Sequence, residues 1–452
     1  MQKDQAIKLL AKLVSFQSVS SDPARHGDLL GAAEFLKSTL AELGFKVELV
    51  STKSKRPLVC AYFRNPIAKE TIGIYTHYDV QPEDPIDKWN SDPFVLTRKG
   101  GKLYGRGIAD DKGHVAQAIT SLKTLISSGR LDYSIIFLIE GEEEAGMAEF
   151  EGLLKDVKIF DLSNVDVWFI LDMGMKAKGK PQIFTGLRGV VSCEIVLETG
   201  ENDAHSGIFG NRIYSAAQIL TTSLGKVKDP DTGEVYIPGF YDDIVPISSN
   251  EYKSLSKDAD SHEELISRSK THILPGKFYI PKGLYPHDMP LALSSKLLPS
   301  FEINGIWSGY TGAGAKTIIP SRASAKFSVR IVQGQSGEKM KKIIHAYFAG
   351  IIPNGVKWTL KIASSEAVGT STDNVWIEKT AQILSNHFGV STEFNRSGGS
   401  IPAAEILSRL YNKPIVMTGF TLPDENIHAP NENIDEEIFF EGIDVLKKLL
   451  SQ

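Results

Sequence analysis

Ile135-Ile136-Phe137-Leu138-Ile139 is an uninterrupted apolar run, and Val167-Trp168-Phe169-Ile170-Leu171 is a second one. Runs of this length and composition are typical of strands that are buried on both faces of a sheet. Between them and around them, apolar residues recur at helical spacing, as they do over residues 115–126. Strands that alternate with helices indicate an α/β fold with a mostly parallel sheet and helices on both faces.

The middle of the chain has a different pattern. Residues 323–331 alternate small or apolar side chains with polar ones, which is typical of an antiparallel sheet with one face in water. A helix is predicted over residues 213–224, and the α/β pattern resumes near Thr372. We therefore predict a discontinuous domain and a second, α+β domain inserted into it. The boundaries are 1–188 and 372–452 for the first domain and 189–371 for the inserted one.

The composition argues against several classes of partner. The chain has 452 residues, with 50 Lys and Arg against 55 Asp and Glu. Without an excess of basic residues, neither nucleic acid nor an anionic membrane surface is expected as a partner. No apolar run approaches the ~18 residues that a membrane span needs. The two cysteines, Cys60 and Cys193, fit a reducing compartment, and we expect a cytoplasmic protein.

Acidic and histidine residues follow the predicted strands at the point where each strand ends. In α/β sheets, ligands gather beyond the carboxyl ends of the strands. Singly, each such residue is more often a turn residue, a helix cap or a surface residue, but their recurrence at successive strand ends indicates one common site. Imidazole and carboxylate ligands suit zinc, cobalt or manganese, and two such ions about 3.5–4 Å apart can activate a hydrolytic water. The candidate ligands are His77, Asp110, Glu144, Asp172 and His428.

Two further acidic residues are placed to support this chemistry. Asp79 comes two residues after His77 and is suited to hold the tautomer of that imidazole. Glu143 and Glu144 are adjacent, so their side chains diverge, and one of them can bind a metal ion while the other acts as a base.

Seven short motifs follow one another along the chain between about residues 70 and 435. The motifs are His77-Tyr78-Asp79-Val80-Gln81-Pro82, Leu103-Tyr104-Gly105-Arg106-Gly107 with Asp110-Asp111-Lys112-Gly113, Glu140-Gly141-Glu142-Glu143-Glu144, Asp203-Ala204-His205-Ser206-Gly207, Gly314-Ala315-Lys316-Thr317-Ile318-Ile319-Pro320, Arg396-Ser397-Gly398-Gly399-Ser400-Ile401-Pro402 and His428-Ala429-Pro430-Asn431-Glu432. In this order they resemble the M20 family of metallopeptidases, most closely its cytosolic dipeptidase (carnosinase-like) branch. The resemblance implies a zinc-peptidase-like catalytic domain with an inserted lid and dimerisation domain.

The resemblance implies a role for each residue of the predicted metal site. Glu143 would be the general base, because Ala145-Gly146 aligns the paired glutamates of the family with Glu143 and Glu144 rather than with Glu142 and Glu143. The peptide between Asp110 and Asp111 would be cis. Zinc is the expected metal, with manganese and cobalt as alternatives. His77 and Asp172 would bind one ion, Glu144 and His428 would bind the other, and Asp110 would bridge the two.

The resemblance also implies roles for residues outside the metal site. His205 would reach into the active site of the other subunit of a homodimer and stabilise the oxyanion of the tetrahedral intermediate. Arg330 would bind the terminal carboxylate of the substrate, for which a planar bidentate donor is well suited. Thr317, Arg396 and Ser400 would add hydrogen bonds to the same end of the substrate.

Three functions are compatible with these residues. The first is a metal-dependent dipeptidase or short-peptide carboxypeptidase, which the set of Arg330, Thr317 and Ser400 favours. The second is an N-acyl-amino-acid deacylase that uses the same metal site. The third is a binding protein without activity, which is disfavoured because every expected metal ligand and the base are present. Ala429 replaces a common Ser of the family and Ser397 a common Glu, which leaves the preferred side chains of the substrate open.

Overall fold

The computed structural model describes residues 2–51, 53, 55–257, 259–269, 278–399 and 401–451. Contacts between residues divide the chain into two compact units. Unit 1 consists of Met1–Thr185, Thr370–Asn395 and Ile401–Gln452, and unit 2 consists of Gly186–Gly369 and Arg396–Ser400. In the part of the chain that is described, no helix is both long and apolar enough to cross a membrane.

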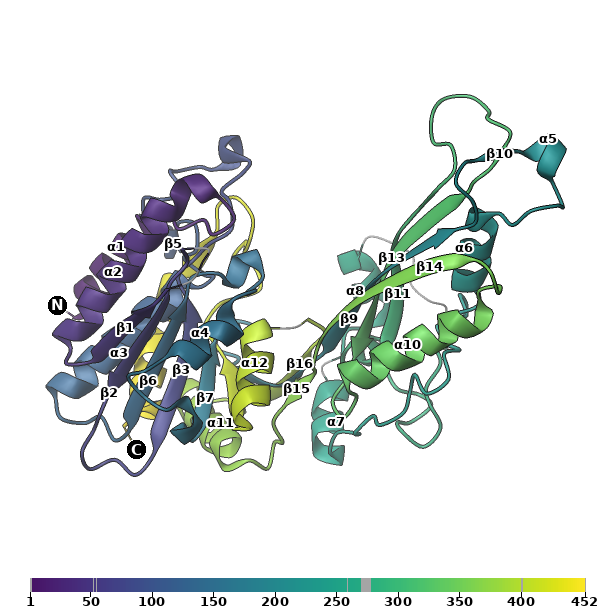
Figure 1. The fold of residues 1–452 in the computed structure, drawn as a ribbon. Helices are drawn as coiled ribbons and strands as arrows, with labels where there is room; N and C mark the ends of the chain where they lie inside the picture. The colour runs from purple at the N-terminus through teal and green to yellow at the C-terminus, as the bar shows by residue number, and fades with distance from the viewer. Residues whose placement is uncertain are drawn as a thin grey trace. The chain divides into compact units, whose positions relative to one another are not determined.

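The sheet of unit 1 has the strand order β1-β2-β6-β3-β7-β17-β8 over the described residues (Figure 1). Its centre is parallel, because β3 pairs in parallel with both β6 and β7, and β17 pairs in parallel with β7. Antiparallel pairings extend it on both sides. The strands are β1 Lys46–Val50, β2 Leu58–Phe63, β3 Thr71–His77, β6 Ser134–Glu140, β7 Val167–Leu171, β17 Ile415–Thr418 and β8 Gln182–Leu187.

The two central apolar runs form β6 and β7, and every residue of both strands is buried. Successive side chains of a strand point to opposite faces of the sheet. Both kinds are buried here because helices cover each face. On one face, Ile74 belongs to the main core, which also contains residues of the helices α1, α3 and α13. On the other face, Tyr75 packs edge-on against Phe150 of α4, and Trp168 lies against Tyr411 of α12. The predicted α/β architecture with helices on both faces is confirmed.

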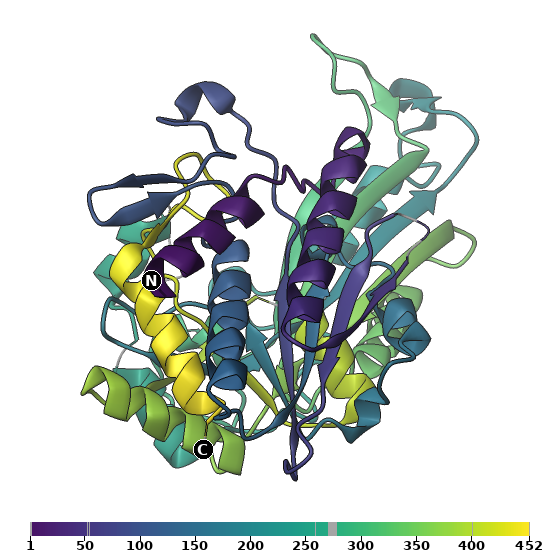
Figure 2. The same ribbon diagram turned by 90° about the vertical axis from the view of Figure 1, so that its left-hand side faces the viewer.

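The helices of unit 1 form two layers. α3 packs against α1, α13 and β3, and Figure 2 shows α1 (purple, at the N-terminus), α3 (blue) and α13 (yellow) side by side. A separate, three-stranded sheet has the order β18-β5-β4. The helices are α1 Gln2–Val14, α2 His26–Glu42, α3 Lys112–Ser127, α4 Phe150–Asp156, α11 Val375–Phe388, α12 Pro402–Tyr411 and α13 Glu436–Leu449, and the remaining strands are β4 Thr97–Lys99, β5 Lys102–Tyr104, β16 Glu393–Ser397 and β18 Asn433–Asp435.

Unit 2 is built on an antiparallel sheet of order β11-β13-β9-β14. Along β13 the burial alternates, and the buried side chains form a core with those of α6 and α10. The other face of β13 carries Ser324, Lys326, Ser328 and Arg330, which are not buried. The strands are β9 Gly189–Glu198, β10 Ala204–His205, β11 Ser300–Ser308, β12 Ile318–Ile319, β13 Arg322–Ile331, β14 Lys357–Ser365 and β15 Val368–Gly369, and the helices are α5 Ser206–Phe209, α6 Ala216–Gly225, α7 Ser249–Lys257, α8 His262–Ser269, α9 Leu291–Leu297 and α10 Gly337–Ile351.

The helix predicted over residues 213–224 begins later than its apolar periodicity suggests. It starts at Ala216, because the side chain of Ser215 accepts a hydrogen bond from the backbone N–H of Gln218 and caps the first turn. A serine in this position satisfies an N–H group that the first turn of a helix leaves without a partner. The prediction was therefore three residues early at this end.

Candidate metal centre and active site

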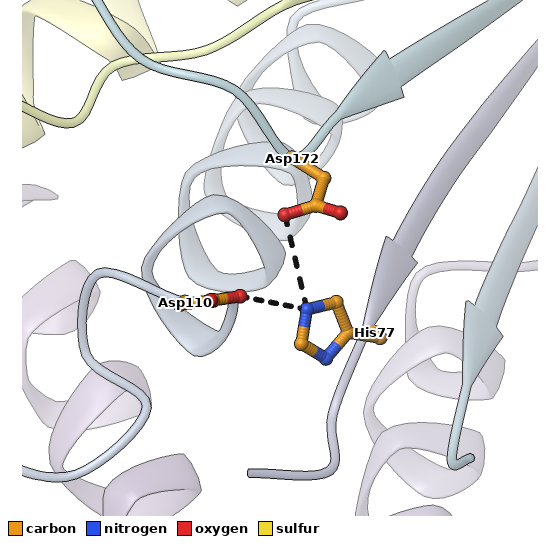
Figure 3. Close-up of side chains that lie close together, drawn as sticks. All are labelled: His77, Asp110 and Asp172. Carbon is orange, nitrogen blue, oxygen red and sulfur yellow. Dashed lines mark hydrogen bonds and ion pairs between the residues drawn. The ribbon is translucent and has the colours of Figure 1, made fainter. Parts of the chain in front are cut away.

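Three candidate ligands from separate elements meet beside the carboxyl end of β3. His77 is the last residue of β3, Asp172 follows β7, and Asp110 lies just before α3. His77 Nε2 is 2.9 Å from Asp110 Oδ1 and 3.9 Å from Asp172 Oδ1 (Figure 3). The peptide between Asp110 and Asp111 is cis. Parallel strands bring their carboxyl ends to one edge of the sheet, which explains why residues so far apart in sequence lie together.

A second group forms on the opposite oxygen of the same aspartate. Asp110 Oδ2 is 2.9 Å from His428 Nε2, and that nitrogen is 3.2 Å from Glu144 Oε1. His428 has a φ of 61°, a left-handed conformation that is uncommon for residues other than glycine and is often found at functional sites. The two oxygens of Asp110 therefore face two different imidazoles.

These five residues fit two divalent cations. In each group, one potential ligand atom from each residue lies within 4.8 Å of the others: His77, Asp110 and Asp172 in one group, and Asp110, Glu144 and His428 in the other. A mixture of imidazole nitrogens and carboxylate oxygens suits zinc and its first-row neighbours. Burial and the nearby charge of Asp110 disfavour the ionised form of Asp172 and raise its pKa well above the ordinary value. A cation beside these carboxylates would offset that repulsion.

The two histidines are paired with the carboxylates around them. Burial lowers the pKa of His77, but hydrogen bonds with Asp110 and Asp79 outweigh burial and raise that pKa well above its ordinary value. Hydrogen bonds with Asp110 and Glu144 raise the pKa of His428 to about 10. In the reverse direction, burial raises the pKa of Asp110, whereas the two imidazoles hold it below its ordinary value.

Asp79 connects the first imidazole to the acidic segment. His77 Nδ1 lies 3.1 Å from the backbone oxygen of Asp79 and 3.4 Å from its Oδ1. The carboxylate of Asp79 also accepts hydrogen bonds from the backbone N–H groups of Glu143, at 3.2 Å, and Glu144, at 3.0 Å. One fully buried side chain thus orients both His77 and the turn that follows β6, as supporting carboxylates do at metal sites.

The three consecutive glutamates have different surroundings. Glu142 is buried and its carboxylate accepts a hydrogen bond from Arg56 Nη1 at 2.5 Å. Glu144 accepts one from Gln81 Nε2 at 2.7 Å and lies beside His428. Burial raises the pKa of Glu143 to about 7; the charge of His77 opposes this, and that of Asp79 adds to it. A carboxyl with a pKa near neutrality is well suited to accept and release a proton.

Sequence reasoning missed a buried pair that supports the same site. His114 Nδ1 lies 2.5 Å from Asp111 Oδ1, and Asp111 Oδ2 accepts a hydrogen bond from the backbone N–H of His77 at 3.1 Å. The backbone N–H of Phe420 donates to His114 Nε2 at 2.9 Å. Burial lowers the pKa of His114 to about 4, which agrees with a neutral imidazole that accepts at Nε2. The signal in the sequence was an aspartate three residues before a histidine in the first turn of a predicted helix.

The other predicted functional residues belong to unit 2. His205 is exposed at the end of β10, and its Nδ1 accepts a hydrogen bond from the backbone N–H of Gly207 at 3.0 Å. Thr317 is exposed as well, and its carbonyl accepts from the backbone N–H of Ser206 at 3.1 Å. Because β10 pairs with β12, His205 and Thr317 lie on neighbouring segments.

The predicted carboxylate-binding residues differ in the hydrogen bonds that their side chains already make. The Nη1 atom of Arg330 is buried and has no hydrogen-bond partner among the described residues. Burial and the like charge of Arg330 lower the pKa of Arg188 to about 10, so a second guanidinium that the sequence analysis did not single out lies close by. Arg396, in contrast, donates to Glu251 Oε1 at 2.7 Å. Ser400 lies outside the described residues.

Comparison with known proteins gives consistent relatives. The chain is 27% identical to the Cys-Gly metallodipeptidase dug1 of Schizosaccharomyces pombe, over 98% of this chain and 94% of the relative. Among solved structures, it resembles an M20 family metallo-carboxypeptidase of Sulfolobus solfataricus with a TM-score of 0.81, 28% identity and coverage of 99% and 98% of the two chains. Human carnosine dipeptidase 1 gives a TM-score of 0.71 and 27% identity, with coverage of 99% and 96%.

The family itself follows from a match to most of the chain. The model of peptidase family M20/M25/M40 matches residues 73–452, a range that contains all five candidate metal ligands. The resemblance that the seven motifs indicated is therefore confirmed. This protein belongs to peptidase family M20/M25/M40.

Proposed function

We propose that the protein is a metal-dependent dipeptidase that hydrolyses dipeptides or short peptides with a free C-terminal carboxylate. The observation that carries this proposal is the position of Asp110, whose two oxygens each lie 2.9 Å from a different imidazole. This geometry supports a carboxylate that bridges two cations. Relatives named as dipeptidases and as a metallo-carboxypeptidase support the choice of a peptide substrate.

The residues of unit 1 divide the chemistry among them. His77 and Asp172 would hold one cation, Glu144 and His428 would hold the other, and Asp110 would contribute to both. When bound, the cations supply an activated water and polarise the scissile carbonyl. Glu143 would accept a proton from the attacking water as the water oxygen bonds to the carbonyl carbon, and would then pass the proton to the amine nitrogen as the C–N bond breaks. Asp79 keeps His77 in the required tautomer. Zinc is the proposed metal, with manganese or cobalt as alternatives.

The inserted domain, residues 189–371, selects the substrate and forms the homodimer, whereas residues 1–188 and 372–452 form the catalytic domain. Arg330 binds the C-terminal carboxylate, and the partnerless Nη1 atom of this residue supports that role. Thr317, Arg396 and Ser400 add hydrogen bonds at the same end. His205 acts on the oxyanion in the site of the other subunit. The reaction takes place in the cytoplasm.

A substrate panel tests the proposal against its alternative, an N-acyl-amino-acid deacylase that uses the same metal site. Metal-free protein, prepared with a chelator, is reloaded with zinc, manganese or cobalt and assayed on Cys-Gly, β-Ala-His, other dipeptides and N-acetyl amino acids. We expect turnover of dipeptides only after reloading. Turnover that is restricted to the N-acetyl amino acids would support the deacylase instead. The Glu143→Gln protein, purified in the same way, controls for contaminating peptidases.

A further inference from the structure

Two motifs that the proposed chemistry does not use meet in the interior of unit 1. They are Gly105-Arg106-Gly107 and the last two residues of the segment His428-Ala429-Pro430-Asn431-Glu432. Arg106 Nη1 donates to Glu432 Oε2 at 2.8 Å, and both side chains are only 1% exposed. Such a pair is weak evidence for stability, because removing two charges from water costs about as much as their attraction returns. Its geometry suggests a different purpose.

The carboxylate of Glu432 holds the backbone of the segment that ends in the bridging ligand. Its Oε2 accepts a hydrogen bond from the backbone N–H of Gly107 at 2.8 Å, and its Oε1 accepts from those of Ala109 at 2.9 Å and Asp110 at 3.2 Å. Gly107 has a φ of 75°, and a Cβ there would lie 2.2 Å from Val80 Cγ1. These hydrogen bonds and this close approach leave the backbone of residues 107–110 little room to move.

Glu432 also belongs to the loop that carries the ligand on the other side of Asp110. It follows His428 by four residues, and its backbone oxygen accepts from the N–H of Gly105 at 3.1 Å. Arg106 ties in a third segment, because its Nη2 donates to the backbone oxygen of Pro82 at 3.0 Å and its guanidinium lies 5.2 Å from the ring centroid of Trp89. One buried ion pair thus joins the loops of Asp110, of His428 and of the residues after His77.

We propose that Glu432, with Arg106 as its counter-ion, is a positioning residue that fixes the spacing between the Asp110 and His428 ligand atoms. It touches neither substrate nor reacting atoms, and it acts through the backbone of Asp110. The inference rests on the proposed two-metal function. Because Glu432 joins Asp110 to His428, it governs chiefly the cation that His428 and Glu144 hold.

Glu432→Gln tests this role with little change of volume. A glutamine amide group points an N–H donor at atoms that already donate, and it leaves Arg106 without a counter-charge. Supporting partners of metal ligands typically contribute 10- to 100-fold to metal affinity. We expect a loss of about this size for the second equivalent of zinc, measured by competition with a chromophoric chelator, and a smaller loss for the first. At saturating zinc, kcat should recover most of its value and KM for a dipeptide should be unchanged.

Glu436→Gln is the matched control. It makes the same acid-to-amide change four residues later and removes an ion pair with Arg98, an exposed side chain at the surface. Both zinc affinities should stay at their wild-type values. If Glu432→Gln matches this control, the positioning role is wrong. If the wild-type protein itself binds fewer than two cations, it is the proposed function that fails.

A double variant separates positioning from folding. Arg106→Gln combined with Glu432→Gln removes both buried charges, so the thermal unfolding temperature of the metal-free protein should return toward the wild-type value. The backbone N–H groups of Gly107 and Asp110 still lack their anionic acceptor, so the affinity for the second zinc should stay low. If zinc affinity recovered together with stability, the proposal would be wrong. Glu432 would then serve only to balance the buried charge of Arg106. This variant also serves if Glu432→Gln alone does not fold.

Discussion

The candidate metal ligands of unit 1 and the candidate substrate contacts of unit 2 are supported very differently. His77 has partners on both ring nitrogens, and the residues that hold it, Asp79 and Asp111, are themselves buried and hydrogen-bonded. In unit 2, His205 is exposed at the end of β10 and Thr317 is exposed just before β12, whereas Arg330 lies on the face of β13 whose side chains are not fully buried.

This difference has a physical origin. The sheet of unit 1 is covered on both faces, and buried groups such as Asp79 and Asp111 anchor the residues at its edge. In unit 2, His205 and Thr317 are exposed, so a further molecule can reach them. The residues around His77 are thus already held by neighbouring groups, whereas His205 and Thr317 are accessible.

The largest expected effect is the loss of the base within the organised site. Glu143→Gln keeps the shape of the side chain but cannot accept the proton from water. We expect kcat on a dipeptide to fall by about 10²- to 10⁴-fold, the usual contribution of a general base, with zinc content unchanged by elemental analysis.

Glu142→Gln is the matched control for this prediction. The carboxylate of Glu142 is already bound by Arg56, so its replacement should lower stability and leave most of kcat. A large loss of kcat in Glu142→Gln together with an active Glu143→Gln would show that the base is the preceding glutamate and that the register of the acidic segment is wrong.

The next effect concerns His205, an exposed candidate of unit 2. His205→Ala should lower kcat by about 10²- to 10³-fold, as expected for the loss of one donor to an oxyanion, and zinc affinity should not change. A mixing experiment tests whether His205 acts in the active site of the other subunit. Mixing His205→Ala with Glu143→Gln protein should restore activity, since a hybrid dimer would contain one complete site. Additive, unrestored losses in the mixture would confine His205 to its own subunit or to a structural role.

A smaller effect is expected at the carboxylate-binding end. Arg330→Lys keeps the charge and removes the planar fork, so KM for a dipeptide should rise by about 10- to 100-fold, the size of one or two charge-assisted hydrogen bonds. A dipeptide amide, which lacks the carboxylate, should show no such change. Arg322→Lys makes the same substitution on the same strand, where the arginine is exposed beside Glu198, and should leave KM unaltered. Equal effects on the acid and the amide would contradict the assignment.

The sequence predicted unit 1 better than unit 2, and periodicity explains why. Fully apolar runs such as the one that forms β6 have few alternatives to a buried strand, and β3 and β7 place their terminal residues at one edge without further information. The start of α6 was missed because a cap such as Ser215 overrides the apolar pattern.

Supporting residues were harder to predict than ligands. Nothing in the local sequence connects Glu432 with Arg106 or Phe420 with His114, because each pair is separated by more than 300 residues and meets only through the fold. The engagement of Arg396 by Glu251 was hidden for the same reason. Residue type predicts which groups can bind a metal ion or a substrate. Only the tertiary structure shows which of these groups already have hydrogen-bond partners within the protein.

The last expected effect is on stability and comes from Glu425, which organises the loop of His428. Its carboxylate is fully buried and accepts hydrogen bonds from the backbone N–H groups of Leu422 and Asp435. Burial outweighs these bonds and raises the pKa of Glu425 to about 7. Because the folded pKa lies above the unfolded one, the stability that Glu425 contributes is complete below about pH 4.5 and is lost as the pH rises through 7.

Glu425→Gln should therefore flatten the pH dependence of stability. In metal-free protein, the unfolding free energy of the wild type should fall relative to that of the variant by up to about 3 kcal/mol between pH 4.5 and 8, measured by urea denaturation. Asp424→Asn makes the same change at the neighbouring exposed acid and should keep most of the pH dependence of the wild type. A curve for Glu425→Gln that runs parallel to that of the wild type would mean that the carboxyl ionises equally in both states. The loop that carries His428 would then be held without the cost of a buried charge.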